Sequence, residues 1–311
     1  MTLPLLPKTA VLVGNAASGH SGVSLDKTKA LIEAAGLRVV ATIAMDDLES
    51  VRGWAREPDD ERPLIVAAGG DGTVGGVADK LSHTSAVLGI IPLGTSNDVA
   101  RSLDIPMKIE DAAALLARGT VSTTDLGQFV GSDGVERHFI HAATLGLNVA
   151  FAKVATQPSL RRRLGRLTYA VAGLEALRER KPFQCTIELE GRCVSLSLIH
   201  LSIINAPVFG GRWSLKLPGS SLEDRQFDIL AIDDQALSHL ALAALPIIFG
   251  RHPHVGGVHL YHERALHIHT AQPLDVSLDG EILGQIPGDF KMASQALRVI
   301  AGPGFAARNG E

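Results

Sequence analysis

The chain has 311 residues, of which 46% are hydrophobic and 20% are charged, and its formal net charge is −4. This composition is too apolar for a disordered chain, and the length allows two domains with separate cores. The negative net charge gives no general attraction to nucleic acid, so we expect no nucleic-acid partner.

The first part of the sequence alternates short β-branched runs with helical segments, which is typical of a parallel sheet with helices packed on it. Ser24 is expected to cap a helix that stops at Gly36, because serine favours helix starts and glycine favours helix ends. The pattern predicts an α/β fold with a doubly wound, mainly parallel sheet, whose ligands bind beyond the carboxyl ends of the strands. The predicted strands are residues 10–13, 37–43, 64–68 and 87–91.

The pattern changes after Gly127, where apolar or alternating segments indicate an antiparallel β-sandwich as a second domain. Leucines and Val171 recur at helical spacing over residues 164–177, and a second helix is predicted at about 238–245. The predicted strands of this domain are residues 183–189, 194–201, 258–261, 266–269 and 274–278.

Several features bear on where the protein works. The first seven residues lack the pattern of a signal peptide, and the longest apolar run, residues 240–249, is about half of the ~20 residues that a membrane helix needs. Cys185 and Cys193 flank a predicted hairpin turn at Gly191 as near neighbours, and two thiols without a leader indicate a reducing cytoplasm. Basic residues at both ends of residues 161–181 indicate either a solvated helix face or a peripheral contact at the inner membrane surface. The oligomeric state stays open, with a homodimer among the options.

Three glycine-rich turns, at residues 14–19, 69–73 and 92–98, each follow a predicted strand. Glycine lets main-chain N–H groups approach a phosphate, and the helix that follows adds its positive terminus. A single turn of this kind could be only a tight connection, but three at one sheet edge predict a polyphosphate site. Neither a P-loop nor a Gly-x-Gly-x-x-Gly at the first helix is present, so the phosphates must be held without a P-loop lysine.

Gly-Gly-Asp-Gly-Thr at residues 69–73, followed about twenty residues later by Pro-Leu-Gly-Thr-x-Asn-Asp, resembles the catalytic domain of diacylglycerol kinases, sphingosine kinases and related bacterial lipid kinases. The resemblance resumes in Asp-Gly-Glu at residues 279–281. It implies transfer of the ATP γ-phosphate to a hydroxyl of a lipid such as diacylglycerol, with Mg²⁺ as cofactor. It also implies an α/β nucleotide domain at residues 1–126 with a returning segment at about 290–311, and a β-sandwich lipid domain at 127–289.

The resemblance assigns nucleotide contacts to the glycine-rich turns and their neighbours. Asp71 is expected to hold Mg²⁺ or a substrate hydroxyl, because a carboxylate in a phosphate-binding loop is otherwise repulsive; capping of the following helix is the alternative. For Asn97 and Asp98, a catalytic role and capping of their own helix both stay open. The implied nucleotide residues are Asn15, Ser18, Gly19, Thr42 as a loose match, Gly69, Gly70, Asp71, Gly72, Thr73, Gly75, Gly94, Thr95 and Asn97.

On the acceptor side, the resemblance implies Glu281 as the base that accepts the hydroxyl proton and Asp279 as the residue that orients it. The alternative is that Asp279 and Gly280 form only a hairpin turn. A second magnesium site at Asp224 is also implied, although Arg225 stands where relatives carry glycine. Asn148 likewise stands where relatives often carry an aspartate.

Two other hypotheses follow from the same residues. NAD kinases and phosphofructokinase-like sugar kinases share Gly-Gly-Asp-Gly, but residues 92–98 differ from the Asn-Glu pair of NAD kinases, and the dense arginine set of sugar kinases is missing. The departures at Arg225 and Asn148 favour instead a nucleotide- or lipid-binding regulatory protein that has lost turnover. Formation of a phosphorylated product would separate these classes.

Overall fold

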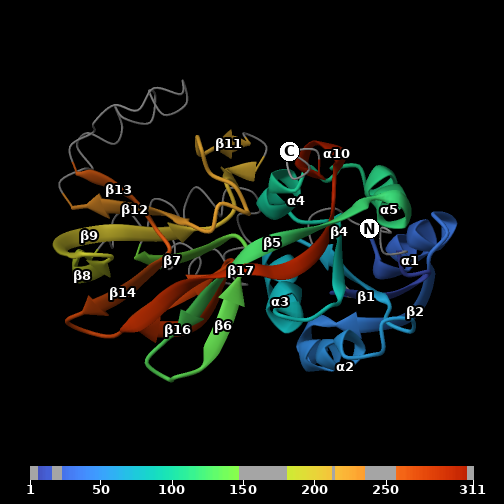
Figure 1. Ribbon diagram of the computed structural model, residues 1–311, viewed down its shortest axis with the longest axis horizontal. Helices are drawn as coiled ribbons and strands as arrows, with labels where there is room; N and C mark the ends of the chain where they lie inside the picture. Colours follow the sequence, from blue (N-terminus) through green and yellow to red (C-terminus); the bar gives the residue numbers. More distant parts are fainter. Residues whose placement is uncertain (1–5, 16–22, 147–180, 212–213, 235–256, 307–311) are drawn as a thin grey trace, which may run out of the picture.

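The computed structural model describes residues 6–15, 23–146, 181–211, 214–234 and 257–306 (Figure 1). Some sequence predictions lie outside these ranges and stay predictions. They are the helices at 164–177 and 238–245, the basic segment up to residue 180, Ser18, Gly19 and Asn148.

The amino-terminal part contains a parallel sheet in the order β2-β1-β3-β4. Each of the four strands begins and ends within one residue of its predicted bounds, which confirms the prediction. The buried run from Leu64 to Ala68 shows why the sequence reads as continuously apolar there, because helices cover both faces of a parallel sheet. The strands are β1 (Thr9–Gly14), β2 (Arg38–Ala44), β3 (Leu64–Gly69) and β4 (Val87–Pro92).

Helices lie on both faces of this sheet, with α1 and α5 on one side and α2 and α3 on the other (Figure 1), which confirms the doubly wound arrangement. Ser24 caps α1 as predicted, since its Oγ accepts from the Lys27 N–H at 3.2 Å, and Gly36 follows the helix with φ +100°. The helical segments are α1 (Leu25–Ala34), the 3₁₀ helix η1 (Met45–Ser50), α2 (Val51–Ala55), α3 (Asp71–Leu81), α4 (Asp98–Ser102), α5 (Ile109–Arg118) and α10 (Pro303–Ala306).

The carboxyl-terminal part is an antiparallel β-sandwich around a second buried cluster, which confirms the predicted fold class. The β8–β9 turn at Gly191 is confirmed. Its strands are β6 (Glu136–Phe139), β7 (Ala142–Gly146), β8 (Phe183–Leu189), β9 (Arg192–Ile204), β12 (Phe227–Asp233), β13 (Val258–Glu263), β14 (Ala265–Thr270), β15 (Leu274–Leu278) and β16 (Glu281–Ile286), with the short pair β10 (Val208–Phe209) and β11 (Leu215–Lys216) beside them.

The two cysteines lie on this β8–β9 hairpin as free thiols. Cys185 is opposite Leu196, and Cys193 is opposite Glu188, so the two side chains are three register positions apart. They share a hairpin but do not face each other, which corrects the expectation that they are near neighbours.

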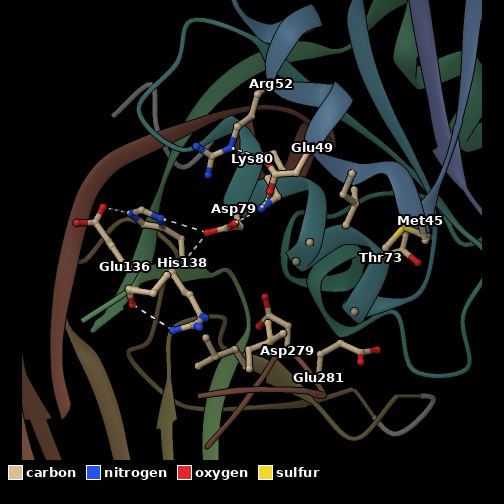
Figure 2. Close-up of a pocket in the computed structure, with 18 of the residues that line it drawn as sticks. Met45, Glu49, Arg52, Thr73, Asp79, Lys80, Glu136, His138, Asp279 and Glu281 are labelled. Carbon is tan, nitrogen blue, oxygen red and sulfur yellow. Dashed lines mark hydrogen bonds and ion pairs between the residues drawn. The ribbon is translucent and has the colours of Figure 1, made fainter. Parts of the chain in front are cut away.

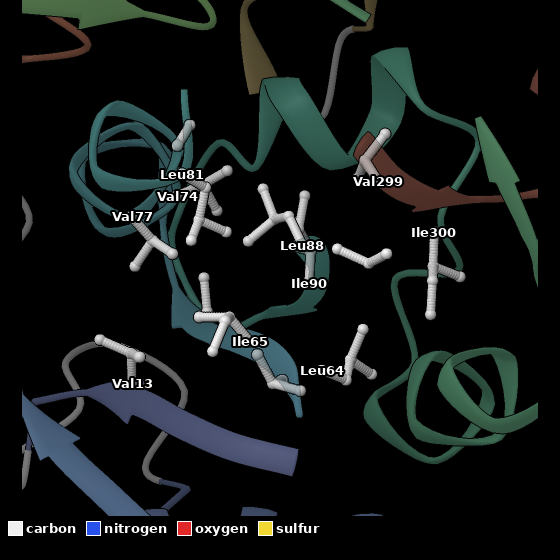
Figure 3. Close-up of a cluster of buried hydrophobic side chains, with 14 of the residues drawn as sticks. Val13, Leu64, Ile65, Val74, Val77, Leu81, Leu88, Ile90, Val299 and Ile300 are labelled. Atoms are coloured by element: carbon white, nitrogen blue, oxygen red, sulfur yellow. The ribbon is translucent and has the colours of Figure 1, made fainter. Parts of the chain in front are cut away.

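Two long strands, β5 (Thr120–Val130) and β17 (Gly288–Ala301), run through both parts of the molecule. β17 pairs with β14 at its start and with β4, in parallel, near its end. Val299 and Ile300 therefore pack into the core of the amino-terminal part (Figure 3), whereas Phe290 packs into the core of the sandwich. The predicted domain limits fall inside these shared strands and stay a prediction.

Within the described ranges, every helix is too short or too polar to cross a lipid bilayer.

Candidate active site

The loop between β3 and α3 packs directly against the loop that follows β4. The Leu93 N–H donates to the Gly69 carbonyl at 2.9 Å. A Cβ on Gly70 would lie 3.1 Å from the Gly94 Cα, and a Cβ on Gly94 would lie 3.1 Å from the Gly70 nitrogen. Glycine at these two positions is what lets the main chains of the two loops meet.

Asn97 and Asp71 hold these loops together. Asn97 has a left-handed backbone with φ +53°, and its side-chain amide accepts from the Gly94 N–H at 2.9 Å and donates to the Gly94 carbonyl at 3.0 Å. Asp71 Oδ1 accepts from the Val99 N–H at 2.9 Å, so Asp71 caps α4 and not the helix that it begins. Neither Asp71 nor Asn97 caps its own helix through its side chain, and both capping alternatives are therefore wrong.

Asp98 is the buried first residue of α4, and its Oδ1 accepts from the Gly211 N–H at 2.8 Å. Burial raises the pKa of Asp98, and the nearby charge of Asp71 adds to this rise, while the Gly211 hydrogen bond opposes it. Two carboxylates, one from each glycine-rich loop, thus lie close enough to repel each other. Such a pair attracts a cation.

Asp279 and Gly280 form the turn between β15 and β16, with φ +49° and +95°, so the hairpin is present, and a functional role of Asp279 stays a prediction. The Asp279 carboxylate also accepts three main-chain hydrogen bonds. Its Oδ2 accepts from Ile140 at 2.9 Å, and its Oδ1 accepts from His141 at 2.8 Å and Ala142 at 3.0 Å. Burial raises the pKa of Asp279 to about 6, although these donors and His141 act against the rise.

The Asp279 turn of the sandwich docks on the first turns of α3. A Cβ on Gly75 would lie 2.7 Å from the Cβ and 2.8 Å from the Cγ of Asp279. A Cβ on Gly72 would lie 3.4 Å from Glu281 Oε1. The structure therefore brings together residues that the sequence places about 200 positions apart.

A cavity of about 560 Å³ opens on one side of this contact. Figure 2 shows Thr73 on one wall and Asp279 and Glu281 on another. Its lining includes the predicted nucleotide residues Asn15, Gly72, Thr73 and Gly75.

The far end of this cavity carries charged residues that the sequence analysis missed. Lys80 Nζ lies 2.7 Å from Glu49 Oε1 and 3.2 Å from Asp79 Oδ2, and the His138 N–H donates to Asp79 Oδ1 at 2.8 Å. Burial acts to raise the pKa of Asp79, but hydrogen bonds with His138 and Lys80 outweigh it, and the pKa is lowered. The sequence could have indicated Lys80 as a cavity residue, because it lies about two helical turns after Gly72 on the same face of α3.

A second cavity, of about 720 Å³, opens on the other side of the contact. Asp71 and Asp98 lie at this cavity, and Asp279 lines both cavities. Its apolar lining includes Phe209, Leu217 and Leu230.

Other predicted residues lie away from the cavity walls. Thr42 is exposed on the edge strand β2 and is not among the described residues that line either cavity. Thr95 is exposed on the loop after β4, next to Gly94.

Asp224 has contacts typical of a turn residue. Its Oδ2 accepts from the Ser221 N–H at 2.8 Å and its Oδ1 from the Gln226 N–H at 2.9 Å. Burial raises the pKa of Asp224, against these two hydrogen bonds. No cluster of three or more histidine, cysteine, aspartate or glutamate side chains suited to a metal occurs in the described part of the chain. The metal role of Asp224 stays a prediction.

Fold and site together define a protein in which an α/β part with glycine-rich loops and a β-sandwich meet at a group of carboxylates. Comparison with known proteins agrees. Residues 9–129 match the model of the diacylglycerol kinase catalytic domain, and residues 142–301 match that of the YegS C-terminal NAD kinase beta sandwich-like domain.

Similar proteins include a diacylglycerol kinase of Bacillus subtilis, 30% identical over 77% of this chain and 78% of the relative, and one of Staphylococcus saprophyticus, 26% identical over 94% and 95%. The crystal structure of a diacylglycerol kinase from Bacillus anthracis superposes with a TM-score of 0.69 at 20% identity, covering 96% of this chain and 98% of the other, which shows a shared fold. The chain belongs to the diacylglycerol kinase family.

Proposed function

We propose that the protein is an ATP- and Mg²⁺-dependent lipid kinase that transfers the γ-phosphate to a hydroxyl of a lipid such as diacylglycerol. The observation that carries this proposal is that a glycine-lined cavity and a partly apolar cavity meet at Asp279. The similar proteins named diacylglycerol kinase support the same activity.

The 560 Å³ cavity suits the nucleotide. The start of α3 presents main-chain N–H groups and the positive end of the helix dipole, which favour phosphate. Thr73 and Asn15 line the same space and add polar groups.

The carboxylates at the junction fit a magnesium ion. Asp71 uses Oδ1 for the Val99 N–H, and no hydrogen bond to its Oδ2 occurs within the described residues. Asp98 lies near it with a raised pKa, so a divalent cation would relieve their repulsion. When bound there together with substrate phosphates, Mg²⁺ would neutralise phosphate charge.

The 720 Å³ cavity suits the acceptor, because Phe209, Leu217 and Leu230 give acyl chains an apolar surface. The acceptor hydroxyl would lie at the Asp71 end, where its oxygen forms the bond to the γ-phosphorus and ADP leaves. Glu281 lines the 560 Å³ cavity beside Gly72, and its carboxylate would take the hydroxyl proton at the junction of the two cavities next to Asp279. Asp279 would position Glu281 by fixing the turn that precedes it.

The test is transfer of labelled phosphate from ATP in the presence of Mg²⁺. The acceptors are diacylglycerol, monoacylglycerol, sphingosine, ceramide and phosphatidylglycerol in mixed micelles, and NAD in solution. Glu281→Gln should lower kcat on the preferred lipid about 100-fold or more with an unchanged thermal midpoint, as expected for loss of a general base. Glu190→Gln, an exposed glutamate at the β8–β9 turn, is the matched control and should act like wild type.

Three outcomes would contradict the proposal. Label in NAD alone would favour an NAD kinase. An ATP-dependent rise in thermal midpoint without any labelled product would favour a regulatory binding protein. Full activity of Glu281→Gln would remove Glu281 as the base.

A further inference from the structure

A row of hydroxyl side chains crosses the sheet face that lines the 720 Å³ cavity. Ser277 of β15 is in register with Thr144 of β7, and Thr144 is in register with Ser202 of β9. Directly opposed residues on antiparallel strands project from the same face of the sheet. Leu230 of β12, opposite Ser202, continues the row with an apolar side chain.

The alternation of side chains along the strands explains why this row faces the cavity. The intervening residues Ala143, Leu145, Leu201 and Ile203 are fully buried in the core of the sandwich. All three hydroxyl residues line the cavity together with Leu230. A polar face is usual where water covers a sheet, but Ser202 and Ser277 are only 6% and 3% exposed, and this favours a ligand role for the row.

The row lies close to the proposed reaction centre. Ala142 is two residues before Thr144 on the same strand face, and its carbonyl accepts from the Asp279 N–H at 2.9 Å. Two residues along a strand span roughly 7 Å. A headgroup whose hydroxyl lies at Asp71 and Asp279 could therefore place a second polar group at the hydroxyl row.

The chemistry of the row suits an uncharged group. Ser202 Oγ forms a 2.7 Å hydrogen bond with His200 Nε2, and burial lowers the pKa of His200 to about 4, so this ring is neutral at pH 7. The Ser202 hydroxyl keeps further hydrogen-bonding capacity, since a hydroxyl has one donor and two acceptor sites. Neither Thr144 nor Ser277 uses its hydroxyl in a hydrogen bond within the described residues.

The charged residues around the cavity also favour an uncharged ligand group. Among the described residues that line it there is no lysine or arginine, whereas Asp71, Asp98 and Asp279 all contribute carboxylates. An anionic headgroup would find no lysine or arginine among these described lining residues to pair with its charge. The acceptor pocket is thus arranged for neutral polar groups beside acyl chains.

We propose that Thr144 and Ser202 determine acceptor specificity by hydrogen-bonding a second, uncharged polar group of the lipid, such as an ester carbonyl, next to the hydroxyl that receives phosphate. This inference rests on the lipid-kinase function proposed above, and it names the residues that would recognise the lipid headgroup.

The test compares two acceptors that share a hydroxyl and chain length. One is a diacylglycerol, and the other is the dialkyl ether analogue, which lacks the ester carbonyls. Wild type should prefer the diester in kcat/KM. Thr144→Val with Ser202→Ala should lower kcat/KM for the diester about 10-fold and leave the ether within about 2-fold, because two neutral hydrogen bonds are removed from one substrate only.

The control is Ser195→Ala on the same strand β9, whose exposed hydroxyl pairs with Thr186 far from the cavity lining. It should keep the wild-type ratio of the two substrates. Thermal midpoints of all variants show whether the fold is intact.

An equal loss on both substrates, or an unchanged ratio in the double variant, would overturn the role of the hydroxyl row while leaving the kinase function standing. A wild type without preference for the diester would overturn it as well. Wild type that phosphorylates no lipid at all would overturn the proposed function, and this inference with it.

Discussion

Gly75 is the position where the contact between the two parts can be tested most directly. Its missing side chain makes room for Asp279, and an added Cβ would lie 2.7 Å and 2.8 Å from two carbons of that residue. Contacts under 3.0 Å require something to move, yet three main-chain donors hold Asp279 in place. Gly75→Ala must therefore either strain α3 or break charge-assisted hydrogen bonds.

The expected magnitude follows from opposing effects. Overpacking a tight contact destabilises by about 1–3 kcal/mol, and a hydrogen bond to a charged group contributes about 1.5–3 kcal/mol. Alanine in place of glycine within a helix stabilises the helix by about 1 kcal/mol, which offsets part of this loss. The net loss should be about 0.5–2 kcal/mol, seen as a fall in thermal midpoint of roughly 1–3 °C for a chain of this size.

Gly76→Ala is the matched control in the same helix. Its Cβ would meet only the ends of flexible side chains, Leu48 Cδ1 at 3.0 Å and Met45 Cε at 3.6 Å, so the midpoint should stay or rise. Asp279→Ala combined with Gly75→Ala should restore part of the loss, because removal of the carboxylate relieves the clash. If Gly75→Ala is tolerated as well as Gly76→Ala, the docking of the Asp279 turn on α3 is wrong.

Three further predictions concern Asp71, Asp279 and Asn205. Asp71→Asn should abolish phosphate transfer at an unchanged thermal midpoint, because an amide oxygen still accepts from the Val99 N–H but no longer attracts Mg²⁺; near wild-type rates would exclude the proposed role. The pKa of Asp279 is raised from 3.8 to about 6, so protonation of this carboxylate stabilises the folded state. This contribution to the free energy of unfolding is fully present below pH 4 and is lost as the pH rises through 6. It amounts to at most about 3 kcal/mol. Thermal melts from pH 4 to 7 should show the wild type losing more than Asp279→Asn, and parallel curves would refute this. Asn205→Ala should destabilise by about 1–3 kcal/mol in urea melts, because its side-chain N–H groups bind the buried Asp125 and Ile140 carbonyls; a neutral effect would argue against both bonds.

Local signals made the amino-terminal fold predictable. Ser24 and Gly36 bound α1 as their capping preferences require, and the four parallel strands follow the apolar runs. The glycines of the two loops were predicted to let the main chain approach a phosphate, which stays a prediction; the structure shows that Gly70 and Gly94 let the two loops approach each other. These features depend on residues within a few positions of each other, which a sequence pattern records directly.

Long-range partners were not predictable in the same way. The hydrogen bond by which Asp71 caps α4, a helix that begins 27 positions later, was not predicted. His138 reaches Asp79 across 59 positions, and Asp279 is held by residues almost 140 positions earlier. Such contacts depend on which strands become neighbours, and a single sequence does not encode that choice in any local pattern.

The strand β17 connects the two parts of the molecule whose contact separates the two cavities. Its register with β5 shifts between Ala293 and Leu297, where the strand passes from the sandwich to the α/β part. Asp125 of β5 secures that shift, since its Oδ1 accepts from the Gln295 N–H at 2.7 Å and its Oδ2 from the Arg225 N–H at 2.9 Å. The two parts are therefore joined by a continuous hydrogen-bonded ladder and not by a linker. The loops and the turn that carry the carboxylates at their junction are therefore anchored in one sheet, as the proposed transfer between two adjacent cavities would require.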